Sequence, residues 1–158
     1  MAIVKSNAVL FDNFVKPVSS SSCLYGETIS AGGSMIIASG GSARYTEVAS
    51  RGTMYVSSRG TATGTDVFSG GVMHVSNGGV ASNTEVLKGG KQYVSNGGSA
   101  AYTDIEGGVM VLLKGSASST EIFSSGIMYI SSGGSADYTD IYSSGKVFVS
   151  AGAMVNST

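Results

Sequence analysis

Charged residues are scarce in this chain of 158 residues, where they make up 12% of the sequence and leave a formal net charge of −1. Such a chain has no basic field that could hold nucleic acid or an anionic membrane surface. Its single cysteine, Cys23, excludes an intramolecular disulfide framework and a multi-cysteine zinc site. No apolar run approaches the roughly 18 residues that a membrane-spanning helix needs. The length suits one domain.

Proline and tryptophan are almost missing, with one and none respectively, whereas glycine occurs 24 times. That much glycine usually indicates a flexible chain. Here 42% of the residues are hydrophobic, and tyrosine, methionine, valine and isoleucine recur at fixed places, so the chain can bury a core. Residues 1–18 lack the order of a signal peptide, because Phe11, Asp12 and Asn13 interrupt the apolar stretch. We therefore expect the chain to be a piece of a longer protein.

A triplet of threonine, an acid and Val or Ile recurs six times, from Thr46-Glu47-Val48 to Thr139-Asp140-Ile141, and successive threonines are 19, 19, 19, 17 and 19 residues apart. Glycines mark two connections in every unit. The 17-residue unit lacks one residue in each connection, where a chain tolerates deletion. An earlier, degenerate unit begins with the acid and the threonine swapped, as Glu27-Thr28-Ile29. The last unit stops incomplete at Thr158, which we interpret as a cut.

A unit of 19 residues with two short β-like runs and two glycine corners cannot bury a face alone, so it needs its neighbours stacked on it. We therefore predict an all-β fold, a single-stranded right-handed parallel β-helix (β-solenoid) with about 19 residues per coil; the handedness follows the general chirality of parallel crossovers. Residues 26–158 are expected to form the repeats and to be truncated at the C-terminus. Residues 1–25 are expected to form an N-terminal cap or lead-in segment. In that segment the apolar side chains expected to cover the open core are Phe11, Phe14, Val15 and Val18.

Alternation along each strand assigns the side chains to faces. Three inward columns are expected: Val48, Val67, Val86, Ile105, Ile122 and Ile141; Val56, Val75, Val94, Leu112, Ile130 and Val149; and Met54, Met73, Gln92, Met110, Met128 and Val147. The triplet threonines also face inward. Their hydroxyls are expected to hydrogen-bond a backbone carbonyl or the threonine of the next coil.

The full pattern of one unit is Gly78-Gly79-Val80-Ala81-Ser82-Asn83-Thr84-Glu85-Val86, continuing through Gly90 to Val94. It resembles the strand-loop-strand repeat of AIDA-type autotransporter passengers, and the resemblance covers about residues 26–158. The resemblance implies a right-handed β-helix on the outside of a Gram-negative bacterium. It also implies roles in adhesion to host cells, self-association of cells and biofilm formation, and in some members O-linked heptose on serines of the repeats.

Two outward columns are candidates for partner binding. The first is a ladder of acids: Glu47, Asp66, Glu85, Asp104, Glu121 and Asp140. It is either a solvated face that keeps the rod soluble or a stripe that binds a cation or a partner. The pattern of a calcium-binding nonapeptide is missing. Repulsion between neighbouring rungs is expected to raise their pKa values.

The second column is largely aromatic: Tyr55, His74, Tyr93, Val111, Tyr129 and Phe148. It is either a structural ladder or a surface that grips another rod or a glycan through many weak contacts. A shorter outward set consists of Phe68, Leu87, Phe123 and Tyr142. His74 is the only histidine, so we expect it to be a member of the ladder and not a metal ligand.

Serines recur after the second strand of each unit, at Ser57, Ser76, Ser95, Ser131 and Ser150. Hydroxyls in turns are ordinary, but the family resemblance adds the alternative that they accept glycans from a glycosyltransferase. A single histidine allows at most one Ser-His pair, and nothing in the sequence marks it. The acids form a uniform ladder, whereas paired carboxylates in catalysis need two different environments that separate their pKa values. We therefore expect no catalytic site, no cofactor and no metal.

The sequence therefore predicts an extracellular adhesin passenger fragment on a bacterial cell surface. Its expected partners are identical rods on neighbouring cells, or a host-surface protein or glycan. Nucleic acid is not expected, and a membrane is expected only through a translocator domain outside this sequence. Two alternatives remain: a carbohydrate-active β-helix enzyme, and a passive stalk that displays another domain.

Overall fold

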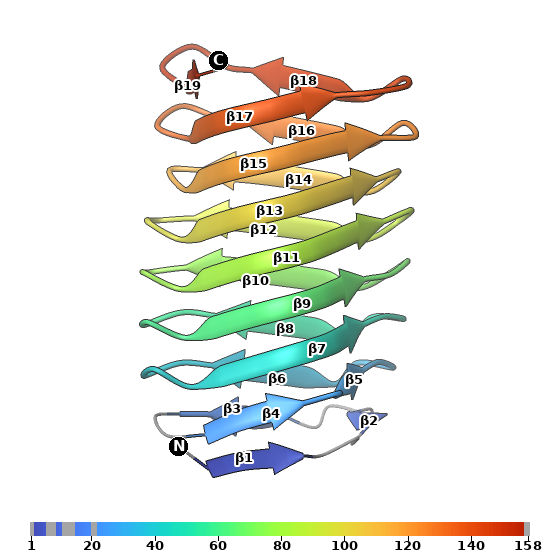
Figure 1. The fold of residues 1–158 in the computed structure, drawn as a ribbon, viewed down its shortest axis with the longest axis vertical. Helices are drawn as coiled ribbons and strands as arrows, with labels where there is room; N and C mark the ends of the chain where they lie inside the picture. The colour runs from blue at the N-terminus through green and yellow to red at the C-terminus, as the bar shows by residue number, and fades with distance from the viewer. Residues whose placement is uncertain (1, 6–8, 11–14, 20–21, 157–158) are drawn as a thin grey trace.

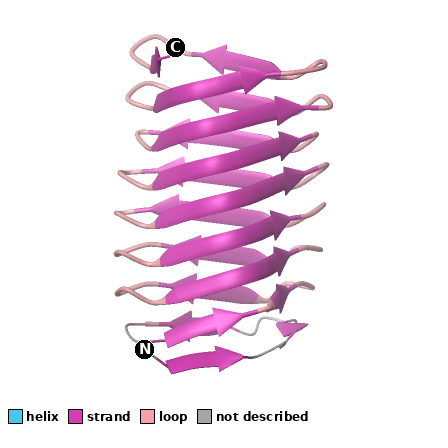
Figure 2. Cartoon of the chain, in the orientation of Figure 1, coloured by secondary structure: helices cyan, strands magenta, loops and turns pink. Residues whose placement is uncertain are grey.

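The computed structural model describes residues 2–5, 9–10, 15–19 and 22–156. These residues form strands joined by short turns, with no helix among them, and the strands stack into a rod of coils (Figures 1 and 2). The part of the chain that the structure describes thus has no helix of the length and hydropathy needed to cross a membrane. Each full coil contributes to two parallel sheets, which lie on the front and the back of the rod in Figure 1.

The first sheet has the order β1 (Ala2–Lys5), β4 (Ser22–Tyr25), β7 (Ser42–Val48), β9 (Thr61–Val67), β11 (Val80–Leu87), β13 (Ser99–Glu106), β15 (Ser116–Phe123), β17 (Ser135–Ile141) and β19 (Met154–Asn156). Two short strands extend it at one side: β2 (Val9–Leu10) and β5 (Thr28–Ile29). The second sheet contains β3 (Val15–Val18), β6 (Ser34–Ile37), β8 (Thr53–Val56), β10 (Val72–Ser76), β12 (Lys91–Ser95), β14 (Val109–Leu113), β16 (Ile127–Ile130) and β18 (Lys146–Val149).

The coil is right-handed. In Figure 1 the front strands run to the right, the rear strands run to the left, and the chain rises from the N-terminus to the C-terminus. Equivalent residues 19 positions apart pair directly, as Thr65 does with Thr84. The 17-residue coil keeps this register, because Thr103 pairs with both Thr84 and Thr120. The predicted parallel β-helix of about 19 residues per coil is therefore confirmed, and both deletions lie in the connections.

The strands before residue 26 belong to the same stack. β1 pairs in parallel with β4, and β3 pairs in parallel with β6. Of the residues expected to cover the open core, Phe11 and Phe14 lie outside the described residues, whereas Val18 is buried. The division of the chain into a segment of residues 1–25 and a solenoid of residues 26–158 stays a prediction.

The core consists of the predicted inward columns. Their members are fully or almost fully buried in every coil from β6 to β16. Two expectations at the last coil are wrong: Ile141 and Val149 are each 54% exposed. No described strand stacks on either of them, because β19 pairs with β17 only from Ser135 to Asp137. A column buries its side chains only where a coil lies on each side.

The expectation for the threonine hydroxyls is also wrong. The Oγ1 atoms of the buried threonines have no hydrogen-bond partner among the described residues; these are Thr46, Thr65, Thr84, Thr103 and Thr120. Threonines with the same rotamer in successive coils have their hydroxyls one strand spacing apart, about 4.8 Å, which exceeds the roughly 3 Å of an O–H···O hydrogen bond. Their methyl groups therefore contribute to the core more than their hydroxyls do.

At the N-terminal end of the core, two positions that carry uncharged side chains in the higher coils carry an ion pair instead. Lys16 pairs in register with Met35, a member of the methionine column. Glu27 precedes Thr28, which pairs with Glu47, so Glu27 stands where the higher coils have threonine. The Lys16 Nζ donates to the Glu27 Oε2 at 2.9 Å, and Glu27 is fully buried. The swapped order in the degenerate unit thus brings a carboxylate into the core.

Strands β7 to β17 of the first sheet each contain one residue in the left-handed backbone region. These residues are Tyr45 (φ 53°), Gly64 (φ 67°), Asn83 (φ 51°), Tyr102 (φ 53°), Ser119 (φ 52°) and Tyr138 (φ 53°). The bend lets Ala43 and Thr46 both face the core, although strict alternation would place residues three apart on opposite faces. Such a conformation costs a residue other than glycine about 1–2 kcal/mol, so the stacked coils must stabilise it.

Candidate binding surface

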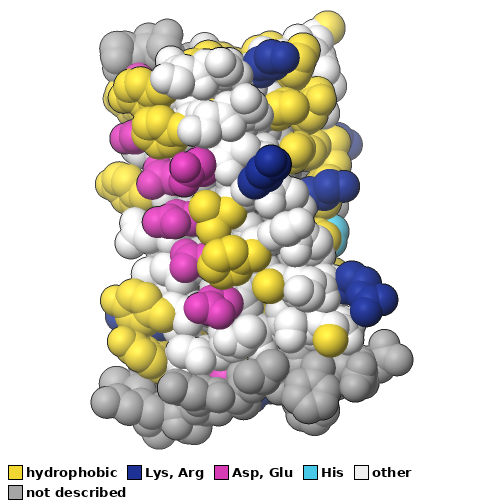
Figure 3. Space-filling view, turned by 90° about the vertical axis from the view of Figure 1, so that its right-hand side faces the viewer, with side chains coloured by type: hydrophobic (Ala, Val, Ile, Leu, Met, Phe, Trp, Pro, Cys, Tyr) yellow, Lys and Arg dark blue, Asp and Glu magenta, His cyan; other side chains and the backbone are white. Residues whose placement is uncertain are grey.

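Six acidic side chains form a column on the outer face of the first sheet, each one residue after an inward-facing threonine. The strand register aligns them rung by rung: Glu47, Asp66, Glu85, Asp104, Glu121 and Asp140. Asp66 is half-buried and the other five are exposed. Figure 3 shows acidic side chains as a vertical row on this side of the rod. The predicted ladder exists as a geometric feature, and its role in binding stays a prediction.

Burial and like charge act on two of these carboxyl groups. Burial is the larger cause that raises the pKa of Asp66 above its ordinary value of 3.8, and the charge of Glu47 adds to it. Burial also comes first in raising the pKa of Glu85 above 4.5, and three neighbouring acids add to it, namely Asp66, Asp104 and Glu106. The pKa is thus raised in the expected direction at these two rungs, and burial is the first cause at each, ahead of any single neighbouring charge.

Aromatic rings stack along the outer face of the second sheet. The rings of Tyr55, His74 and Tyr93 lie nearly parallel, with centroid distances of 5.1 and 5.2 Å and interplanar angles of 8° and 13°. Nearer the C-terminal end, Tyr129 and Phe148 stack at 5.1 Å and 15°. Stacked pairs contribute about 0.5–1.5 kcal/mol each beyond the area they bury. The column therefore stabilises the sheet, and it still exposes 41% of Tyr55 and 49% of Phe148 to solvent.

The single histidine belongs to this stack. Burial between the two tyrosine-bearing coils lowers the pKa of His74 below its ordinary value of 6.5, which favours the neutral ring at pH 7. Within the described residues, no group of three or more His, Cys, Asp or Glu side chains is placed to hold a metal ion. The geometry therefore gives His74 the role of a ring in a stack.

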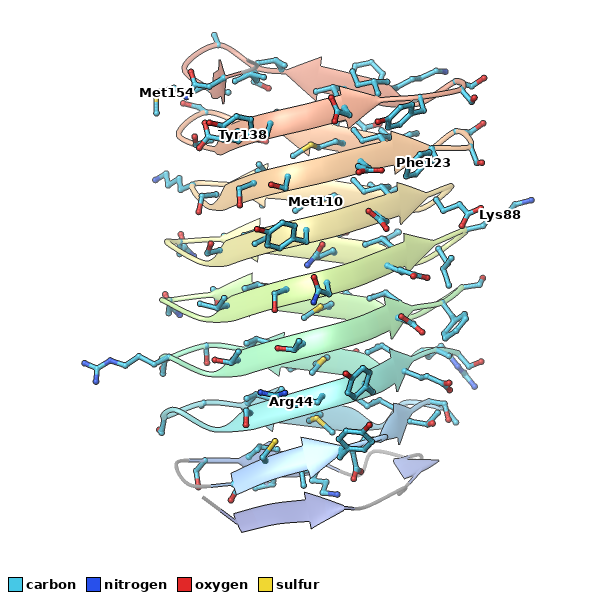
Figure 4. The ribbon with its side chains drawn as sticks, in the orientation of Figure 1. Arg44, Lys88, Met110, Phe123, Tyr138 and Met154 are labelled. Carbon is cyan, nitrogen blue, oxygen red and sulfur yellow. The ribbon has the colours of Figure 1, made fainter. Side chains whose placement is uncertain are left out.

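The shorter outward set lies at the edge of the first sheet. The register places Glu106 between Leu87 and Phe123, so a charge interrupts the apolar side chains there. Phe123 and Tyr142 stack at 4.8 Å with an interplanar angle of 6°. A depression of about 560 Å³ follows this column, and Lys88, which extends from its corner in Figure 4, lines it.

The recurring serines begin the turns at one corner of the rod. In each turn the serine carbonyl accepts a hydrogen bond from the backbone N–H three residues later, as Ser57 does from Gly60 at 2.7 Å. Ser57, Ser76, Ser95 and Ser131 are half-buried, and Ser150 is exposed. These hydrogen bonds use only the backbone carbonyl, so they stabilise the turn without requiring serine. A role of the serines as glycan acceptors stays a prediction.

Sequence reasoning missed a third outward column, the left-handed residues of the first sheet. It contains three strongly exposed tyrosines, Tyr45, Tyr102 and Tyr138, with 57%, 64% and 59% of their surface accessible. Figure 4 shows Tyr138 on the front face of β17. A signal was present in the sequence, since each of these tyrosines directly precedes the threonine of a triplet.

Comparison with known proteins agrees with the repeat. Residues 27–71 match the model of a family described as "AIDA: Adhesin of bacterial autotransporter system, probable stalk". A search of curated proteins gave no match. Among solved structures, the TibC-catalyzed hyper-glycosylated TibA55-350 fragment is 26% identical, with 99% of this chain and 97% of that chain covered and a TM-score of 0.38. The predicted resemblance is confirmed over residues 27–71, which match the family model of an autotransporter adhesin described as a probable stalk.

Proposed function

We propose that this chain is a segment of a bacterial cell-surface adhesin that mediates attachment and self-association of cells, as in biofilms. The observation that carries the proposal is the repetition of exposed side chains, rung upon rung, along one rod. A partner that contacts one rung weakly can make the same contact on the next, so the total strength grows with the number of coils engaged. The family match to an adhesin stalk supports this function.

A contact surface is proposed on each sheet: the aromatic column on the second sheet and the acid ladder on the first. The members of the aromatic column are Tyr55, His74, Tyr93, Tyr129 and Phe148. Exposed aromatic side chains are enriched at protein interfaces because they bury large apolar area and still offer polar edges. The acid ladder, on the outer face of the first sheet, would attract cationic groups of a partner that contacts that face. The proposed partners are a second rod or a host-surface protein or glycan.

The location and the modification belong to the same proposal. A passenger of this family would stand outside the cell and act without catalysis or a cofactor. The turn serines would accept sugars from a glycosyltransferase, with the exposed Ser150 as the most accessible. The intact mass of the protein purified from its native host checks this: added masses of hexose or heptose size support glycosylation, and an unmodified mass contradicts it.

A passive stalk that displays another domain is the second candidate, favoured by the description of the matched family as a stalk. Beads coated with the chain separate the two. An adhesin should clump them, and the substitutions Tyr55→Ser and Tyr129→Ser should reduce the clumping. Ser132→Ala, in an exposed turn, serves as a control that should leave clumping unchanged. Beads that neither clump nor bind cells would favour the stalk.

A further inference from the structure

The three tyrosines at left-handed positions have different surroundings. The ring of Tyr45 packs against that of Tyr25, with centroids 5.0 Å apart, and covers the next coil at Gly64, where an added Cβ would lie 3.0 Å from the Tyr45 ring. Tyr102 and Tyr138 pair with no other ring among the described residues. They are also the two most exposed tyrosines, at 64% and 59%. Neither burial nor stacking within the chain explains their rings.

The backbone makes these tyrosines unexpected. Glycine and asparagine adopt the left-handed region most easily, and the same column has them at Gly64 and Asn83. The coil repeats this conformation at every rung, so the strain belongs to the fold. What the fold does not explain is a bulky, exposed ring at a position that glycine and asparagine occupy more easily. The column thus indicates that the rings of Tyr102 and Tyr138 face a ligand.

A depression of about 340 Å³ lies between these two rings. Ser119 stands between them in the same column, one coil from each, and its small side chain leaves the space open. The second side of the depression is formed by acids of the ladder, at Asp104, Glu121 and Asp140. The site therefore has two aromatic walls, a small polar floor and carboxylate acceptors along one edge.

The spacing of the two tyrosines limits the size of the ligand. Tyr102 and Tyr138 are two strands apart, which corresponds to about 9.6 Å along the rod. Carbon contacts of about 3.5–4.0 Å on each side occupy about 7–8 Å of that span. The span therefore admits one ring between the two side chains. The C–H face of a sugar ring would pack on tyrosine, and its hydroxyls would donate to the carboxylates.

We infer that the groove between Tyr102 and Tyr138 binds a neutral hexose or N-acetylhexosamine unit of a glycan. The carboxylates repel sialic acids, uronic acids and sulfated sugars, so the groove rejects anionic glycans. The inference rests on the exposed rings of the two tyrosines, and the neighbouring carboxylates exclude ligands with negative charge. The inference rests on the proposed adhesive function and names the ligand class of one place on the rod.

A glycan array tests the inference with the full chain. The array carries neutral β-linked hexose and N-acetylhexosamine oligosaccharides beside their sialylated and sulfated counterparts. The variants are Tyr102→Asn and Tyr138→Asn, which install the residue that the chain itself uses at Asn83. Tyr45→Asn is the matched control, because it makes the same change at the same backbone position outside the depression. Circular dichroism confirms that each variant keeps its strands.

The chain should bind neutral oligosaccharides and none of the anionic counterparts, with little dependence on salt. Each groove variant should weaken binding at least tenfold, and Tyr45→Asn should leave it unchanged. Four results would overturn the inference: no glycan binding, preference for anionic glycans, equal loss in the control, or binding of the polyamine spermine alone that salt removes. If the parent chain clumps beads but binds no glycan, and the groove variants clump them equally well, this site is refuted while the proposed adhesion stays intact.

Discussion

Replacement of Gln92 by methionine should stabilise the rod. Gln92 is fully buried in a column that has methionine in the coils on both sides, at Met73 and Met110. Its Nε2 contacts only the Met73 sulfur, at 3.8 Å, and its Oε1 has no hydrogen-bond partner among the described residues. A buried polar atom without a partner costs about 1–3 kcal/mol. Methionine fills the same space without that atom, so Gln92→Met should raise the free energy of unfolding by about 1–3 kcal/mol.

Urea unfolding followed by circular dichroism and by tyrosine fluorescence measures the change, and coincident curves justify a two-state treatment. For a chain of this size, each kcal/mol should raise the Tm by about 2–4 °C. Met128→Gln is the matched control, because it introduces an amide into the same column away from Gln92 and should destabilise by a similar amount. A Gln92→Met protein that is no more stable than the parent would refute the assignment of a cost to this amide.

Three further changes test other parts of the rod. Gly71→Ala should destabilise it by about 1–3 kcal/mol in urea unfolding, because the added Cβ would lie 2.6 Å from a carbonyl carbon of the coil below. The raised pKa values of Asp66 and Glu85 add stability that is full below their ordinary values of 3.8 and 4.5 and is lost as pH rises through the raised values. Asp66→Asn should therefore make the urea midpoint fall less steeply with rising pH, and an unchanged slope would contradict this. Lys16→Met should destabilise by about 3–5 kcal/mol because it leaves the buried Glu27 carboxylate unpaired. Adding Glu27→Thr should recover the lost stability, because it restores the residue type that the higher coils have at this position. A double variant as unstable as Lys16→Met alone would contradict the unpaired carboxylate as the cause.

The fold was predictable because a parallel coil gives equivalent positions equivalent surroundings. Each coil must place an aliphatic residue where its neighbours do, so the positions of Val48 and Val56 repeat along the sequence and reveal the columns. The loss of two residues in one unit did not obscure them, because the strands bear the register and the corners absorb the deletions. The acid ladder and the aromatic column followed from the same alternation.

The left-handed column was not predictable from alternation. Gly64, Asn83 and Tyr102 share a backbone conformation and no side-chain property, so the sequence pattern does not group them. The clue was the spacing of three between Ala43 and Thr46, both of them inward, which requires a bend in the strand. The ion pair was not predicted for another reason. The coil brings Lys16 and Glu27 together across the core, and the six clear repeats have no charged residue at either position.

Repetition and selectivity come from different parts of this rod. Where every rung of a column carries a similar side chain, a partner can bind equally well at several positions along the rod. Such a column increases the strength of binding but does not determine where the partner binds. Hollows lie both at regular corners, as at Ser39, Ser58 and Asn77, and where the repeat changes. Ser119 separates two tyrosines in one depression, and the corner shortened at Gly107 borders another, beside the charge that Glu106 brings into an apolar column. Both changes belong to the coil of residues 103–120 or directly adjoin it. Only the hollows beside this irregular coil combine side chains that no other coil repeats. A ligand that recognises a single place on the rod should therefore bind there, whereas the regular coils offer contacts that recur along the rod.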